Sequence, residues 1–112
     1  MKKESTWLKL PLELLQHKQT SLSTKIIYTY MLWRYQFFSV KGSKYFEAQD
    51  TIATMCNVSR KTVNESIQKL SSLGWVVCTR SNLPSSLYEV KDVYGLYNKR
   101  EVQGEDVFEE PF

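Results

Sequence analysis

The side chains best suited to chemistry lie close together just past the middle of the chain. Arg60 and Lys61 follow Ser59 directly, and Asn64 and Gln68 come one and two helical turns later. Arg and Lys donate hydrogen bonds to guanine, while Asn and Gln form paired hydrogen bonds with adenine. A Ser hydroxyl and the free amides at a helix start bind phosphate. On the exposed face of a helix these residues would read duplex DNA; the plainer interpretation is an ordinary solvated surface.

No other set of reactive side chains indicates a reaction. His17 is the single histidine, and two cysteines, Cys56 and Cys78, are too few and too far apart for a zinc site. Glu47 and Asp50 resemble a carboxylate pair, but acidic residues are also favoured at a helix N-terminus. Because a phosphate-binding glycine loop is also missing, we expect no enzyme activity, no metal and no cofactor. The cysteines are expected to be small core residues with free thiols.

A helix beginning after Ser59 would carry the polar set. Its apolar residues are spaced four, three and three apart, which places them on one helical face: Val63, Ile67, Leu70 and Leu73. Ser59 is a good N-cap, and Gly74 suits the left-handed residue that follows a helix end. The spacing therefore predicts that the polar residues at 59 to 68 face away from the core.

A shorter helix is expected immediately before it, from Gln49 to Cys56, with Ile52, Ala53 and Met55 facing inward. The turn between the two helices must reverse direction sharply, and Asn57 tolerates the left-handed backbone that such a turn requires. Small Ala53 permits close packing of the helices, and Val58 would fill the corner. This arrangement predicts a helix-turn-helix, whose second helix enters the major groove.

The N-terminal part of the chain is expected to form helices that pack against the helix-turn-helix. A helical turn is predicted over residues 10–15, with Pro11 at its start, and a long helix over residues 22–38, with N-cap residues in 20–23. Two neighbouring stripes at helical spacing run along the long helix: Leu22, Ile26, Tyr30, Trp33 and Phe37 form one, and Ile27, Met31, Arg34 and Phe38 form the other. Its aromatics exceed what one buried face needs. They are either core with some half-exposed rings, or the surface of a homodimer or another partner.

Three segments are typical of strands. Tyr45–Phe46 is very short, Trp75–Arg80 is rich in β-formers, and Ser86–Lys91 alternates apolar and polar residues after a turn at 81–85. The fold class is therefore α+β, a three-helix core with a β-hairpin wing. Residues 1–97 are expected to form this DNA-binding domain, and residues 98–112 a flexible acidic tail.

Charge divides the chain at the same point. Residues 1–100 hold fifteen basic and seven acidic side chains, a net charge of +8, whereas residues 101–112 carry five acids and no base. A basic body favours a polyanionic partner, usually nucleic acid. An acidic tail repels that partner or recruits another, and it can also be simple solvation.

The segment Phe46–Val76, FEAQDTIATMCNVSRKTVNESIQKLSSLGWV, resembles the winged helix-turn-helix domains of replication initiators and replication-associated proteins of plasmids and phages. Related patterns occur in GntR- and MarR-type transcription regulators. The resemblance implies a wing from the last two strands, with Arg80 beside its tip. It also implies DNA contact from the matching residues of the recognition helix, which are Ser59, Arg60, Lys61, Asn64 and Gln68. The chain departs from the family at Ala48, where a Ser or Thr cap is usual, and at the wing tip, which has no Lys or Arg.

The C-terminus carries a second resemblance. The chain ends in an acidic stretch followed by Pro-Phe, and this is similar to the tip of bacterial single-stranded-DNA-binding proteins. That likeness implies that Glu109, Glu110, Pro111 and Phe112 dock on a host replication or repair protein. A solvating acidic tail is the other interpretation, because short motifs have high false-positive rates.

Composition limits the remaining classes. The chain has 112 residues, 42% hydrophobic and 24% charged, as in a globular domain. No apolar run approaches the ~18 residues of a membrane span, and no apolar segment follows the N-terminus as in a signal peptide. We therefore expect a cytoplasmic protein that binds double-stranded DNA and no membrane, in replication of a mobile element. A small transcription regulator and a protein-binding adaptor are the alternatives.

Overall fold

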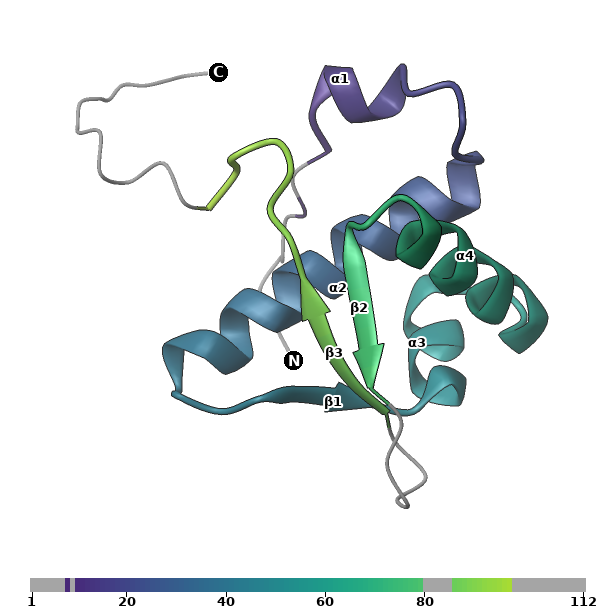
Figure 1. Cartoon of the computed structure of the whole chain (residues 1–112). Coiled ribbons are helices and arrows are strands. Elements are labelled where there is room, and N and C mark those ends of the chain that lie inside the picture. The colour runs from purple at the N-terminus through teal and green to yellow at the C-terminus, as the bar shows by residue number, and fades with distance from the viewer. Residues whose placement is uncertain (1–7, 9, 80–85, 98–112) are drawn as a thin grey trace, which may run out of the picture.

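The computed structural model describes residues 8, 10–79 and 86–97 (Figure 1). Within them the chain forms four helices and three strands. In chain order these are α1 (Leu12–Leu15), α2 (Leu22–Val40), β1 (Tyr45–Glu47), α3 (Gln49–Cys56), α4 (Arg60–Ser72), β2 (Val76–Thr79) and β3 (Ser86–Val90). The predicted order of elements is confirmed, and α2 is two residues longer than expected.

The three strands form one antiparallel sheet in the order β1-β3-β2. β3 is central: Tyr88 lies opposite Tyr45 of β1 and opposite Cys78 of β2. β2 and β3 form the hairpin expected for a wing. Together with the three larger helices this sheet makes an α+β winged helix-turn-helix, as the sequence predicts.

The core lies where α2, α3 and α4 meet the inner face of the sheet. In Figure 1, α2 passes behind the strands, α3 and α4 lie to one side, and the described chain ends on the opposite side. The largest fully buried side chains come from every element except β3: Leu14, Ile27, Tyr28, Met31, Leu32, Tyr45, Ile52, Val63, Leu70 and Val76. Burial of this apolar surface is the main force that holds α4 in place.

The two stripes predicted for α2 differ in how far they are buried. Ile27 and Met31 are fully buried, whereas Leu22, Ile26 and Phe37 of the other stripe are exposed, with Leu22 at 59%. Tyr30 is the buried member of that first stripe. Trp33 of the same stripe packs against the core, so this stripe is core in its middle and exposed towards both ends.

Part of the buried face of α2 consists of polar residues. Lys25 is buried because its ammonium Nζ donates to the carbonyl oxygens of His17 and Thr20, both at 2.8 Å. Thr24 Oγ1 lies 2.9 Å from Ser66 Oγ, and this buried pair joins α2 to α4. These contacts satisfy polar groups that would otherwise be costly to bury, so they fix the rotation of α2 about its axis.

Two expectations about side chains were wrong. Met55 was expected to face inward, but it is 60% exposed, because α3 packs through Ile52 and Ala53. Glu47 was expected to serve a helix N-terminus. Its carboxylate is instead buried and accepts hydrogen bonds from the hydroxyls of Tyr30 and Tyr45. Burial, together with these bonds to Glu47, raises the pKa of both tyrosines.

The segment after β3 is anchored to α2. The Tyr28 hydroxyl donates to the carbonyl of Lys91 and accepts from the backbone N–H of Val93. The Asp92 carboxylate accepts from the backbone N–H groups of Leu96 and Tyr97 at 2.8 and 2.6 Å. The packed structure thus extends past the last strand to Tyr97, and residues 98–112 lie outside the described part. In the part described, no helix has the length and hydropathy of a membrane span.

Candidate nucleic-acid interface

The turn between α3 and α4 has the backbone that the sequence predicts. Asn57 adopts φ 58° and ψ 47°, the left-handed region, and it is the one non-glycine described residue with positive φ. The backbone N–H of Val58 donates to the carbonyl of Ala53 at 3.0 Å. Ala53 is buried, and its small side chain lets α4 pack closely against α3. The turn therefore sets the direction in which α4 leaves the domain.

The start of α4 is capped as expected. The backbone N–H of Thr62 donates to Ser59 Oγ at 3.1 Å, and the two hydroxyl oxygens lie 2.9 Å apart. Helix geometry leaves the amides of Arg60 and Lys61 without partners inside the helix. The capping bond occupies the Ser59 hydroxyl, so these two amides are the better candidates to receive a phosphate at this helix start.

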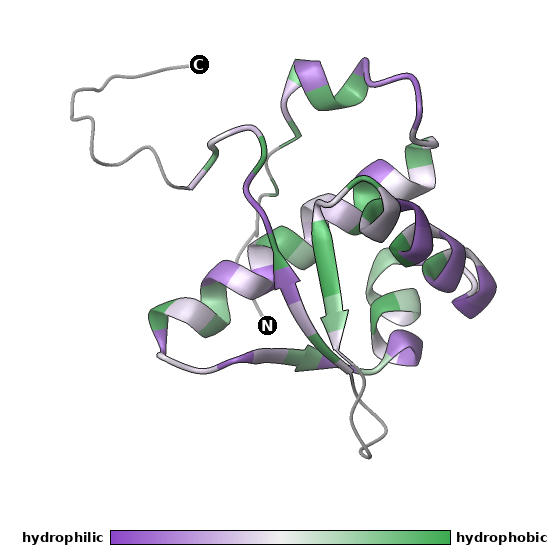
Figure 2. Cartoon of the chain, in the orientation of Figure 1, coloured by the Kyte–Doolittle hydropathy of each residue, from purple (hydrophilic) through white to green (hydrophobic). Residues whose placement is uncertain are grey.

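The two faces of α4 differ as the spacing predicts. Val63, Ile67 and Leu70 are buried, and Leu73 is a half-buried C-cap. Gly74 follows with φ +80°. Figure 2 shows the outward side of α4 as hydrophilic and its inward side as hydrophobic. The predicted rotation of this helix about its axis is therefore confirmed.

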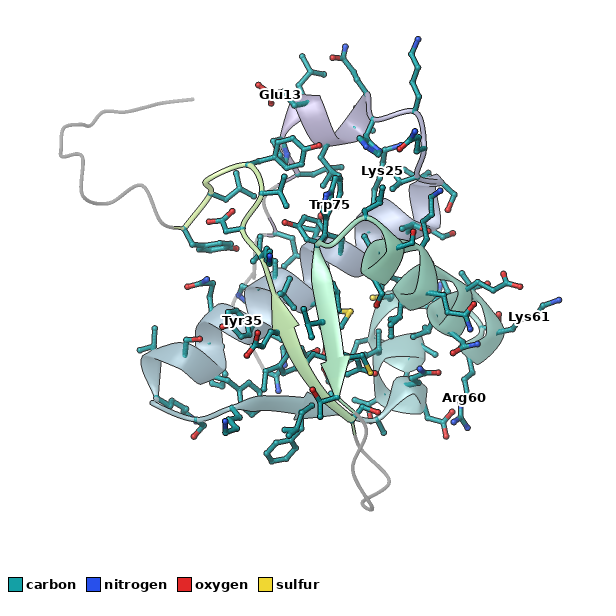
Figure 3. All side chains as sticks on the ribbon, viewed as in Figure 1. Glu13, Lys25, Tyr35, Arg60, Lys61 and Trp75 are labelled. Atoms are coloured by element: carbon teal, nitrogen blue, oxygen red, sulfur yellow. The ribbon has the colours of Figure 1, made fainter. Side chains whose placement is uncertain are left out.

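The predicted contact residues emerge from this outward side. Ser59, Arg60, Lys61 and Gln68 are exposed, and Asn64 is half-buried. In Figure 3 the labelled side chains of Arg60 and Lys61 both project from α4 away from the sheet. The fold thus brings all five residues to one surface, with two cations at the end nearest the turn.

Three charged residues of this surface were not among the predicted contacts. Glu65 and Lys69 are also exposed on α4, between and beside the predicted residues. Asp50, in the first turn of α3, forms an ion pair with Arg60, with Asp50 Oδ1 3.5 Å from Arg60 Nη1. The helical spacing of Glu65 and Lys69 could have identified them, whereas the Asp50 contact depends on how the two helices cross.

Other predicted site residues lie outside this surface or outside the described residues. Arg80, beside the wing tip, is not among the residues that the structure describes, and neither are Glu109, Glu110, Pro111 and Phe112 of the tail. Ala48 is the N-cap residue of α3 and provides no side-chain cap, which agrees with the departure seen in the sequence.

The remaining reactive groups have packing roles. The His17 ring lies 5.0 Å from the Trp75 ring, and its Nδ1 is 3.2 Å from Thr20 Oγ1. Cys56 and Cys78 are free and half-buried against the core, and burial together with nearby Glu47 raises the pKa of the Cys56 thiol to about 11. Over the described residues, no cluster of three or more metal-ligating side chains occurs.

Residues 21–76 match the sequence profile of a family described as the helix-turn-helix domain. This chain belongs to that family. The match covers α2, β1, α3 and α4 in full, so the helix-turn-helix domain contains all five candidate contact residues on or beside α4. No curated protein sequence matches the chain at a significant level.

A solved structure described as a Rep–DNA complex is similar to this helix-turn-helix protein. The TM-score is 0.60 with 14% sequence identity, and the match covers 89% of this chain and 92% of the other. At this identity the likeness concerns the fold.

Proposed function

We propose that this protein binds duplex DNA by inserting α4 into the major groove. The observation that carries the proposal is the outward face of α4, where Arg60, Lys61 and Gln68 are exposed on the helix that follows the Asn57 turn. Such side chains provide donors for base edges and phosphates. The helix-turn-helix family and the likeness to a Rep protein solved with DNA support the same reading.

We further propose that the bound site is an origin of replication of a plasmid, phage or other mobile element. The resemblance of Phe46–Val76 to replication-associated proteins and the Rep–DNA likeness favour this role. The alternatives are a small transcription regulator and a protein-binding adaptor. Residues 1–97 would bind the DNA, and the acidic residues 98–112 would act outside that contact.

Two partners follow as proposals from particular residues. The exposed apolar side of α2, with Leu22, Ile26 and Phe37, would suit a homodimer. The C-terminal Glu109, Glu110, Pro111 and Phe112 would suit a pocket on a host replication or repair protein. Each partner would add to DNA binding and neither is needed for α4 to reach a groove.

Selection of bound duplexes from a random library, with the full chain at a stated salt concentration, tests the proposal. We expect enrichment of one short site whose affinity falls steeply as salt rises. The control is the Arg60→Ala, Lys61→Ala double variant, which should retain its melting temperature and enrich nothing. Failure of the wild type to retain any duplex would overturn DNA binding and favour the adaptor.

The biological role is tested separately. The selected sequence is placed on a plasmid without another origin, and replication is measured in cells that supply the protein. Replication that depends on both the site and Arg60 supports the initiator role. Repression of a promoter through the same site, with no replication, would instead favour the transcription regulator.

A further inference from the structure

Arg60 forms an ion pair with a residue of the neighbouring helix. Its Nη1 lies 3.5 Å from Asp50 Oδ1, although both side chains remain largely exposed, at 66% and 73%. Asp50 is in the first turn of α3, and Arg60 is the first residue of α4. The pair therefore joins the N-terminal turns of the two helices. The labelled Arg60 lies at the end of α4 that is proposed to read DNA (Figure 3).

An exposed ion pair of this kind adds little to folding stability. Its effect is on the direction of the guanidinium, which carries five N–H donors in a planar fork. The contact joins Nη1 to the carboxylate, and a guanidinium has further N–H donors with which to bind a base. A guanidinium whose orientation is restrained, and which keeps N–H donors available, suits the paired acceptors O6 and N7 of guanine.

We propose that Asp50 is a positioning residue for Arg60 and so sets how well the protein discriminates its target from other DNA. This inference rests on the proposed DNA-binding function. On random duplex, Arg60 needs only a phosphate in any direction, and the Asp50 carboxylate competes with that phosphate. On the target, Arg60 must point one way, and Asp50 supplies that direction.

Asp50→Asn removes the charge and keeps the size of the side chain. We expect affinity for random duplex to rise about fivefold, since a weak competing ion pair and its repulsion of phosphate are lost. We expect affinity for the selected site to change less than twofold, because the same gain is offset by lost orientation. The specificity ratio should therefore fall about fivefold.

Two comparisons separate positioning from simple repulsion of DNA. In an Arg60→Gln background, Asp50→Asn should leave the specificity ratio unchanged, because no guanidinium remains to be oriented. Glu13→Gln makes the same change in net charge on α1, at the far end of the molecule from Arg60 (Figure 3), and should leave both affinities unchanged. If Asp50→Asn strengthens binding to both duplexes equally while Arg60 is present, Asp50 only repels phosphate and the proposal is wrong.

A measurement without DNA keeps the inference separate from the proposed function. The side-chain Nε–H signal of Arg60 reports its motion by ¹⁵N relaxation. We expect Arg60 to become more mobile in Asp50→Asn and to be unaffected by Glu13→Gln. Unchanged mobility would overturn the positioning role even if the wild type binds its site, whereas wild type that binds no duplex would overturn DNA binding and this inference with it.

Discussion

Arg60 and Lys61 are neighbours in the chain but differ in surroundings. Arg60 has an ion-pair partner on α3, while Lys61 projects from α4 beside it. A guanidinium forms two directed hydrogen bonds to one base, whereas an ammonium acts as a point charge. We therefore expect Arg60 to contribute specificity, together with the half-buried amide of Asn64, and Lys61 to contribute general affinity.

Alanine variants of these residues test the division. Arg60→Ala or Asn64→Ala should cost about 1–3 kcal/mol on the selected site and relax preference at one or two base positions. Lys61→Ala should weaken all duplexes about equally and lower the salt slope by about one. Binding is measured on selected and random duplex across a salt series. Equal losses on both duplexes for Arg60→Ala would contradict its assignment.

Tyr28 makes folding stability depend on alkaline pH. Burial raises the pKa of its hydroxyl to about 12, against an ordinary value near 10. Above pH 10 the unfolded chain loses this proton more readily than the folded chain, so stability falls as pH rises from 10 to 12. Tyr30 and Tyr45, whose pKa values are also raised, act in the same direction.

Urea unfolding between pH 8 and pH 11 measures this effect. We expect the midpoint to be flat below about pH 9 and to fall above about pH 10. Tyr28→Phe should be less stable at neutral pH, because it leaves the N–H of Val93 unpaired, but its stability should fall less steeply in alkali. A slope identical to that of the wild type would show that Tyr28 ionises equally in both states.

At the scale of elements, the left-handed turn between α3 and α4 depends on one residue. Asn57 adopts φ 58°, which Asn and Gly tolerate better than other residues. Asn57→Ala should therefore destabilise the domain by about 1 kcal/mol. Asn57→Gly is the matched variant and should change stability by less, since glycine accepts this backbone. Thermal unfolding of the two variants decides: equal losses would mean that the Asn57 side chain, rather than its backbone, matters.

The packing of α4 rests on its buried face. Leu70 is fully buried, so Leu70→Ala should cost about 2–5 kcal/mol through lost transfer energy and the cavity left behind. Leu22→Ala is the matched control on α2, because Leu22 is 59% exposed and the same truncation leaves no cavity. Denaturant unfolding compares the two. A Leu70 variant as stable as the control would mean that α4 does not depend on this face.

The helix-turn-helix was readable from sequence because each local signal agrees with its neighbours. Ser59 caps α4, Asn57 permits the turn, and the spacing of Val63, Ile67 and Leu70 defines one face. These are local interactions, which depend on residues a few positions apart. The five candidate contact residues could be predicted from the same pattern, since they lie on or beside the face of α4 that is not buried.

The rotation of α2 could not be read in the same way. Apolar and aromatic residues surround this helix, so periodicity favours no single face. Its true inward face includes Lys25, whose ammonium is satisfied by carbonyls of a loop that precedes the helix. Glu47 is similar, because its burial depends on the hydroxyls of Tyr30 and Tyr45, and Tyr30 comes from another element. Such satisfaction of buried polar groups appears only when the elements are assembled.

For the whole molecule, the basic body and the acidic tail have opposite charges, and the tail could weaken the binding of DNA to the body. The body carries a net charge of +8 and the last twelve residues carry −5. Neutralising Glu105, Asp106, Glu109 and Glu110 should strengthen DNA binding if the tail shields the body, most clearly at low salt. Deleting Pro111 and Phe112 removes no acidic side chain and should leave DNA affinity unchanged. Binding isotherms of both variants at two salt concentrations test this.

The deletion also tests the proposed docking partner. A peptide of residues 104–112 should retain a replication or repair protein from bacterial extract, and the same peptide without Phe112 should not. An aromatic anchor with an acidic rim suits a small pocket, and the affinity should be modest because a free peptide loses entropy on binding. Retention of the same proteins by both peptides would remove the docking proposal and leave solvation or shielding as the role of the tail.

The buried hydroxyl pair of Thr24 and Ser66 has a mechanical consequence. It joins one point of α2 to one point of α4, at 2.9 Å, between two buried residues. Rotating either helix alone would break this bond and take Ser66 Oγ away from its partner, at a cost of about 1–3 kcal/mol, whereas Thr24 Oγ1 would keep its contact with Ser21 Oγ at 3.0 Å. A torque applied to the solvent side of α2, near Leu22 and Ile26, is therefore transmitted to the helix proposed to read DNA. A partner that binds the exposed side of α2 would therefore also affect the orientation of α4.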